Sequence, residues 1–187
     1  MAPDERNKVA KLSDYFIDTG LTGEEVKALI SVGDSITRER ELIEMGNCVN
    51  GKSLDNRLAV YISIEVLKRL HNVSIPYDLH MVFTVQEEVG LRGANVAALK
   101  INPDFGFGLD TTIAYDLPGA PAHEMITKMG EGTAIKIMDS STICDYRMVD
   151  YMKKIANEND IKWQPEILTG GGTDTAGVQR MTAGGSI

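Results

Sequence analysis

The chain has 187 residues, enough for an ordinary globular domain, and its 43% hydrophobic and 25% charged residues exclude a disordered protein. Its formal net charge of −8 argues against nucleic acid or an anionic membrane surface as a partner. No apolar run could cross a bilayer and no secretory signal opens the chain, so we expect a cytoplasmic protein. Cys48 and Cys144 are too few for a disulfide framework, and we expect reduced thiols.

The first fifty residues read as a β-rich region with little core of its own. Short strands are predicted at residues 15–18 and 32–36. Thr22, followed three residues later by Glu25, fits a capping box that opens a helix carrying Val26, Leu29 and Ile30. The Asn-Gly step at Asn50 marks the boundary, which gives one region over residues 1–50 and another over residues 51–187.

The second region alternates helices with strands. From residue 56 to residue 70, apolar side chains recur every three or four positions and widen into a broad stripe, which predicts a core helix buried on more than one side. Strands are predicted at residues 79–85, 105–111 and 162–168, and helices at 95–99 and 144–158. This order predicts an α/β fold, a mixed and mostly parallel sheet covered by helices on both faces.

Two adjacent carboxylates, Glu87 and Glu88, follow the predicted strand at 79–85 and precede a glycine-rich turn. In open α/β sheets the ligand crevice lies at the carboxyl ends of the strands. Neighbouring residues of an extended segment point to opposite sides, so one glutamate could ligate a metal while the other moves a proton. The simpler alternative is a solvated acidic turn.

Three other segments also place an acid at a strand end or a turn. Asp55 precedes the predicted core helix, where it could instead be an N-cap, and Asp110 ends a strand, where it could simply start a loop. Asp174 closes a run of glycines at residues 170–174. Asp116, before a Pro-Gly step, is better interpreted as a turn former and receives no metal.

In order and spacing these segments, with the specific QEEVGLRGA run at residues 86–94, resemble the glutamyl and deblocking aminopeptidase family of dinuclear-metal exopeptidases. The resemblance implies a three-layer zinc-exopeptidase-like sandwich, incomplete here, with part of an inserted β-rich oligomerisation domain over residues 1–50. It also implies removal of N-terminal residues from peptide substrates by a water that two divalent metals, zinc or cobalt, activate. Homo-oligomers are typical of the family.

Residue by residue, the resemblance assigns Asp55 as the ligand that bridges two metals, Glu88 and Asp110 as terminal ligands, and Glu87 as the general base. Asp174 would support the site. A bridging carboxylate suits metals roughly 3.5 to 4 Å apart, because each oxygen can take one ion.

The chain departs from the family pattern in its histidines. The family's two metal-binding histidines have no counterpart, and His71, His80 and His123 show no ligand spacing. We therefore expect a fragment of a longer enzyme whose carboxylates alone form an empty or weak site that favours hard ions. A non-catalytic domain with relic acids stays open as an alternative. A glycoside hydrolase is a further alternative. That chemistry needs carboxyl groups about 5 to 9.5 Å apart across a sugar ring, and the adjacent Glu87 and Glu88 are badly arranged for it.

Overall fold

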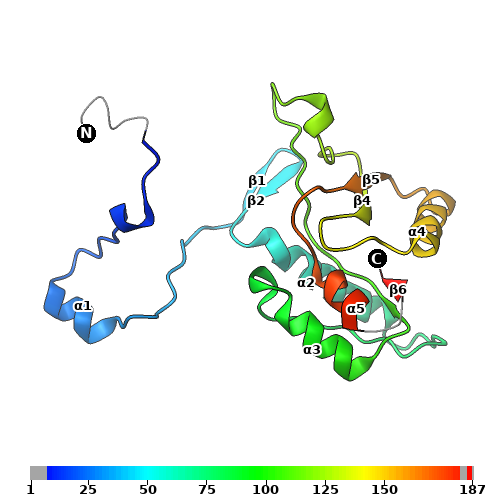
Figure 1. Cartoon of the computed structure of the whole chain (residues 1–187), viewed down its shortest axis with the longest axis horizontal. Helices are drawn as coiled ribbons and strands as arrows, with labels where there is room; N and C mark the ends of the chain where they lie inside the picture. The colour runs from blue at the N-terminus through cyan, green and yellow to red at the C-terminus, as the bar shows by residue number, and fades with distance from the viewer. Residues whose placement is uncertain (1–7, 182–184, 187) are drawn as a thin grey trace. The chain divides into compact units, whose positions relative to one another are not determined.

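The computed structural model describes residues 8–181 and 185–186 of the chain (Figure 1). Contacts between residues divide the chain into two units, Met1–Glu41 and Leu42–Ile187. Among the described residues, no helix is both long enough and apolar enough to pass through a bilayer.

The first unit contains the 3₁₀ helix η2 (Leu12–Asp14) and the helix α1 (Gly23–Leu29). The predicted capping box is confirmed, because Thr22 Oγ1 accepts a hydrogen bond from the Glu25 amide at 3.4 Å and Glu25 Oε2 accepts one from the Thr22 amide at 2.9 Å. The strands predicted at residues 15–18 and 32–36 are wrong. Both segments lack a strand partner within the described part of the unit, so no ladder of hydrogen bonds forms.

The second unit opens with an antiparallel hairpin of β1 (Ile43–Met45) and β2 (Cys48–Asn50). Gly46 sits in the turn at φ +62°, a left-handed conformation that glycine adopts without strain. The helix α2 (Leu54–Leu70) follows and confirms the predicted helix, but not its burial. Ser63 is its buried residue, while Leu58 and Tyr61 are 49% and 61% exposed. The helix α2 has no extensive contact with another described helix or strand, so it is not a core helix within the described part of the chain.

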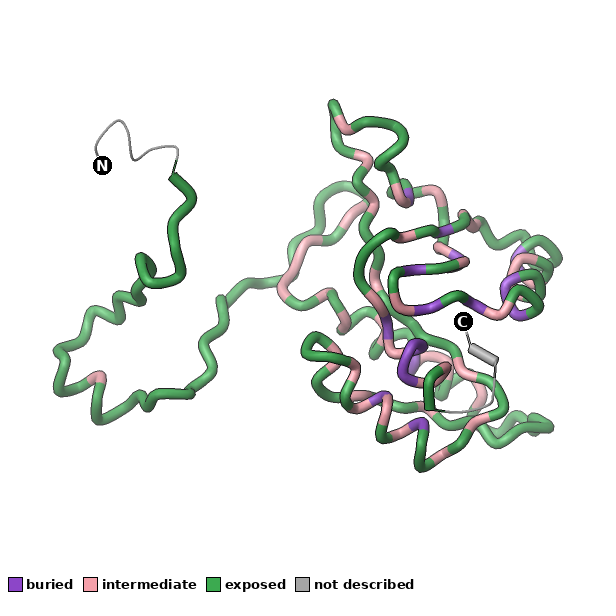
Figure 2. The backbone as a smooth tube through the Cα atoms, viewed as in Figure 1, coloured by how far each residue is buried: buried purple, intermediate pink, exposed green. Residues whose placement is uncertain are grey.

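The best-packed part of the unit is a β–α–β arrangement. The parallel strands β4 (Thr133–Met138) and β5 (Trp163–Ile167) are joined through α4 (Tyr146–Glu158). The core here consists of Ile135, Cys144, Met148 and Val149. The predicted helix and the predicted strand near residue 165 are confirmed, whereas β4 was not predicted. Figure 2 shows buried positions in β4, α4 and α5.

A second packed contact joins α3 (Arg92–Ile101) to α5 (Asp174–Met181). The buried faces carry small residues, and a Cβ added at Gly177 would lie 3.1 Å from the Cβ of Ala94 and 2.7 Å from Oδ1 of Asn95. The absence of a side chain at Gly177 therefore lets the helices approach closely. The helix predicted at residues 95–99 is confirmed as the longer α3.

The predicted sheet is confirmed only as small pieces. The strand predicted at 105–111 is reduced to β3 (Phe105–Gly106), which pairs in parallel with β6 (Gly185–Ser186). The strand predicted at 79–85 is wrong, since no described residue pairs with this segment in a ladder. The result is a mixed helix and strand fold with three two-stranded sheets over the described residues, two of them parallel.

Candidate active site

The start of α2 presents Asp55 without using it as a helix cap. Asp55 and Asn56 depart from helical backbone angles, and the regular helix begins after them. Asn56 does the capping instead, because its Oδ1 accepts a hydrogen bond from the Ala59 amide at 3.1 Å. The Asp55 carboxylate is exposed and makes no hydrogen bond within the described residues. The N-cap interpretation of Asp55 is therefore wrong.

Asn56 also connects α2 to the chain segment that carries Asp110. Its Nδ2 donates to the carbonyl oxygen of Leu109 and to Oδ1 of Asp110, both at 2.8 Å. The same Asp110 oxygen accepts from the Thr111 amide at 2.8 Å. Two segments more than fifty residues apart are thus held together by one amide side chain. The sequence interpretation gave Asn56 no role.

Glu87 and Glu88 lie in the 3₁₀ turn η3 (Glu87–Val89), not on an extended segment as expected. With three residues per turn, successive side chains still diverge, by about 120°. Gly90 closes the turn at φ +112°, and Gly93 donates its amide to the Val85 carbonyl at 3.0 Å. A Cβ at Gly93 would meet the backbone of Val85 at 2.6 Å, so the second glycine of this run is required by close packing.

The glycine-rich loop at residues 170–173 leads into α5, whose first residue, Asp174, accepts a hydrogen bond at Oδ2 from Thr84 Oγ1. Thr84 precedes the Glu87 turn by three residues, so this bond ties the loop to that turn. On the other side, Ser140 and Ser141 donate their hydroxyls to the Gly171 carbonyl. No sequence pattern indicates these roles of Thr84 and the two serines, because their partners lie far away in the chain.

Electrostatics place the acids from these segments in one neighbourhood. Burial raises the pKa of Glu87 to about 6, with added repulsion from Asp110, Asp174, Glu88 and Asp55 in that order. Burial is also the main cause that raises the pKa of Asp110. Repulsion from Asp55 and Asp174 adds to that rise, while the Thr111 amide and Lys136 oppose it. Carboxylates that repel one another in this way would be stabilised by a shared cation.

The donor set suits hard divalent cations, since it consists of carboxylate oxygens. One more oxygen is available, because Asp174 Oδ1 is buried and has no hydrogen-bond partner within the described part of the chain. Over residues 8–181 and 185–186, however, no three acidic, histidine or cysteine side chains lie close enough to hold a metal ion. The acids therefore share a neighbourhood without forming a closed ligand shell.

The remaining candidates are Asp116 and the three histidines. Asp116 Oδ2 accepts a hydrogen bond from the Met129 amide at 2.9 Å, 13 residues further on, whereas the nearby turn is closed by the Ala120 amide and the Leu117 carbonyl, so Asp116 makes a long-range contact and not the predicted turn. His71 follows the end of α2, His80 lies in the unpaired segment at 79–85, and His123 lies in the short 3₁₀ helix η4 (Ala122–Glu124). The Nε2 of His123 is 3.8 Å from a Glu124 oxygen.

Comparison with known proteins decides the family. Residues 1–186 match the model of the M42 glutamyl aminopeptidase family. The chain belongs to this family. Among M42 relatives, a protein of Acetivibrio thermocellus is 37% identical over 182 residues, which are 97% of this chain and 54% of that protein. The glutamyl aminopeptidase of Lactococcus lactis is 34% identical over 182 residues, or 95% of this chain and 50% of that enzyme.

Solved structures agree with this M42 assignment. A TET aminopeptidase from a marine sediment archaeon of the Thaumarchaeota matches with a TM-score of 0.91 and 35% identity, over all of this chain and 54% of that one. The TET1 peptidase of Pyrococcus horikoshii, which can assemble into a tetrahedron or a large octahedral shell, matches with a TM-score of 0.73 and 28% identity, over 87% of this chain and 48% of that one. The M42 chain described here thus spans about half the length of its relatives.

Proposed function

We propose that this chain contributes the carboxylate half of the active site of a metal-dependent aminopeptidase that removes N-terminal residues from peptides. Membership of the M42 family supports the reaction class. The observation that carries the proposal is the electrostatic coupling of Glu87 to acids from three other segments. A solvated acidic turn would show no such coupling.

Within this proposal, Asp55, Glu88 and Asp110 would hold two divalent cations, with Asp55 as the ligand that both would share. Zinc or cobalt is the proposed metal, and when bound it would polarise the scissile carbonyl and acidify a water. Glu87 would act as the general base, taking a proton from the attacking water and passing it to the leaving amine. A carboxyl with a pKa of about 6 is well matched to proton transfer near neutral pH.

Asn56 and Asp174 are proposed as positioning residues. Asn56 holds the Asp110 segment against the start of α2 through its two 2.8 Å bonds. Asp174 fixes the glycine-rich loop against Thr84, while its other oxygen is buried and has no hydrogen-bond partner among the described residues. Such outer contacts orient the ligands and tune their basicity.

For the domain organisation, we propose that residues 1–50 belong to an inserted domain that mediates homo-oligomer assembly and residues 51–187 to the catalytic domain, a three-layer sandwich. The assembly of the Pyrococcus horikoshii relative into closed shells supports the homo-oligomer. The structural division after Glu41 lies close to the proposed boundary.

Hydrolysis of aminoacyl p-nitroanilides by the 187-residue chain, with zinc or cobalt added, tests the function. Because carboxylates alone form a weak site, we expect weak turnover that requires saturating metal, that EDTA abolishes, and that Glu87→Gln lowers by about 10²- to 10⁴-fold. No turnover at saturating metal would favour a non-catalytic domain with relic acids. Glu158→Gln, which neutralises an exposed acid at the end of α4, is the matched control.

A further inference from the structure

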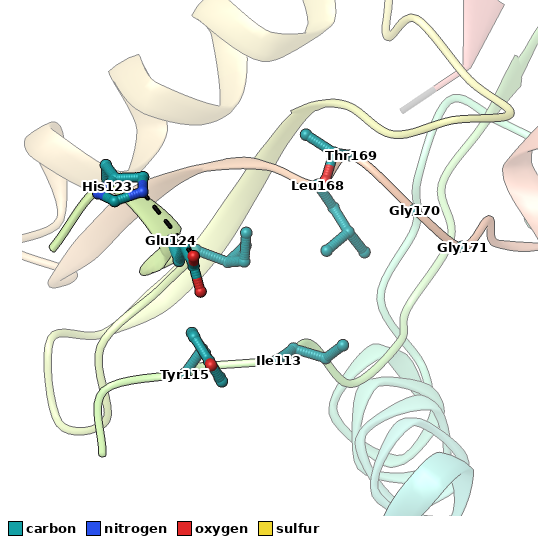
Figure 3. Close-up of a pocket in the computed structure, with 9 residues that line it drawn as sticks. Ile113, Tyr115, His123, Glu124, Leu168, Thr169, Gly170 and Gly171 are labelled. Atoms are coloured by element: carbon teal, nitrogen blue, oxygen red, sulfur yellow. Dashed lines mark ion pairs between the residues drawn. The ribbon is translucent and has the colours of Figure 1, made fainter. Parts of the chain in front are cut away.

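A pocket of about 610 Å³ lies beside the glycine-rich loop (Figure 3). This volume is within the range of small-molecule sites in proteins. The pocket is lined by Ile113, Tyr115, His123, Glu124, Ile126, Leu168, Thr169, Gly170 and Gly171. The M42 acids are not among the lining residues, so the pocket is a separate feature of the second unit.

Two segments that carry proposed site residues continue directly into this pocket. Ile113 follows Asp110 by three residues, and Gly171 precedes Asp174 by three. Three residues of extended chain reach at most about 11 Å. The Cα atoms of Ile113 and Gly171 in the pocket wall therefore lie at most about 11 Å from those of Asp110 and Asp174. A single amino-acid residue of a substrate can span a distance of this order.

The lining combines apolar walls with one carboxylate. Ile113, Ile126 and Leu168 supply aliphatic surface, and Figure 3 shows Glu124 directed into the same space from η4. None of the nine lining residues is a lysine or an arginine, and the Glu124 side chain remains 49% exposed beside His123. The pocket thus combines aliphatic walls with a negative charge.

We propose that this pocket receives a basic side chain, lysine or arginine, of the substrate's N-terminal residue. The methylene groups of such a side chain would pack on Ile113 and Leu168, and its cationic end would approach Glu124. Lysine and arginine commonly bury their methylene groups on apolar surface while the charged end stays in a polar environment. This inference rests on the proposed aminopeptidase function, because that function supplies the N-terminal residue. An acidic side chain would be repelled by the same carboxylate.

Binding to the isotope-labelled 187-residue chain, followed by NMR without metal, tests the inference independently of catalysis. The probes are argininamide, leucinamide and the α-amide of glutamic acid. We expect argininamide to shift the amide signals of residues 113–115 and 168–171 and to bind more tightly than the other two. Glu124→Gln should weaken argininamide binding about twofold to fivefold and leave leucinamide binding unchanged, as expected for one partly exposed charge pair.

Glu158→Gln is the control, because it makes the same charge change at an exposed acid away from the pocket. Three results would overturn the inference. Leucinamide could bind as tightly as argininamide or more tightly, or Glu124→Gln and Glu158→Gln could weaken argininamide binding equally. The third result is that no probe shifts the signals of the pocket residues. None of these results depends on turnover. The p-nitroanilide assay therefore separates a failure of this inference from a failure of the proposed function.

Discussion

The Nδ2 atom of Asn56 lies 2.8 Å from Oδ1 of Asp110, although 54 residues separate the two in the chain. The same amide caps the regular part of α2 through Ala59. One side chain thus fixes both the helix that follows Asp55 and the carboxylate proposed as the ligand of the second metal.

Asn56→Ala should lower the free energy of unfolding of the second unit by about 1 to 3 kcal/mol, because it removes a helix cap and a hydrogen bond to a charged group. Urea unfolding measures this change. Asn159→Ala is the control, since among the described residues the Asn159 side chain bonds only locally, to the Ile155 carbonyl four residues earlier at the end of α4. Equal losses in the two variants would contradict the connecting role of Asn56.

The pKa of Glu87 should be directly visible in the metal-free chain. Its folded value of about 6 lies above the ordinary value of 4.5, so ionisation opposes folding. Stability should therefore fall as pH rises from about 4.5 through 6, and Glu87→Gln should remove this loss, a gain of about 1 kcal/mol at pH 7 after allowance for solvent screening. Titration of the Glu87 carboxyl ¹³C signal measures the pKa, and melting curves at several pH values measure the stability. A Glu87 carboxyl that titrates near pH 4 would contradict the prediction.

The two cysteines should differ in reactivity. Burial raises the pKa of the Cys144 thiol to about 11, whereas Cys48 is only half-buried at the end of the hairpin. Since the thiolate is the reactive form, iodoacetamide at pH 8 should modify Cys48 at least about tenfold faster than Cys144. Peptide mapping by mass spectrometry reads both rates, and Cys48→Ser should leave a slowly labelled chain. Equal labelling of both residues would refute the buried position of Cys144.

Gly93→Ala tests the packing under the glutamate turn. The new Cβ would lie 2.6 Å from the backbone nitrogen and oxygen of Val85, so the turn must shift, and we expect a loss of about 1 to 3 kcal/mol. Gly170→Ala is the comparison, because a Cβ there meets nothing within 4 Å and its φ is not positive. Thermal unfolding of both variants gives the answer, and a Gly93→Ala protein as stable as Gly170→Ala would show that the contact is absent.

The features that the sequence predicted correctly depend on neighbours in the chain. The Thr22 and Glu25 capping box, α3 and α4 are set by residues a few positions apart, so local patterns indicate them. The wrong strand at 79–85 has suitable residues but no partner in the described part of the chain, and a strand needs one. The prediction that α2 is buried was wrong for a similar reason, because α2 has no extensive contact with another described helix or strand.

The candidate site follows the same division. Asp55, Glu87, Glu88 and Asp110 stay predictions, which could be made from the sequence because each motif is local. The structure does give physical reasons for two glycines beside the glutamates, Gly90 and Gly93. Asn56 and Thr84 were missed because their partners, Asp110 and Asp174, are 54 and 90 residues away. Only the folded chain reveals such pairs.

The central claim is that acids from separate segments of this chain meet at a site for divalent cations. Titration of the isotope-labelled chain with Mn²⁺ tests it most directly, because the paramagnetic ion broadens NMR signals near its binding site. We expect weak binding that broadens residues 55–56, 87–88 and 110–111 together, and Asp110→Asn should reduce all three effects. Broadening spread over unrelated acidic surfaces, or unchanged by Asp110→Asn, would contradict the claim.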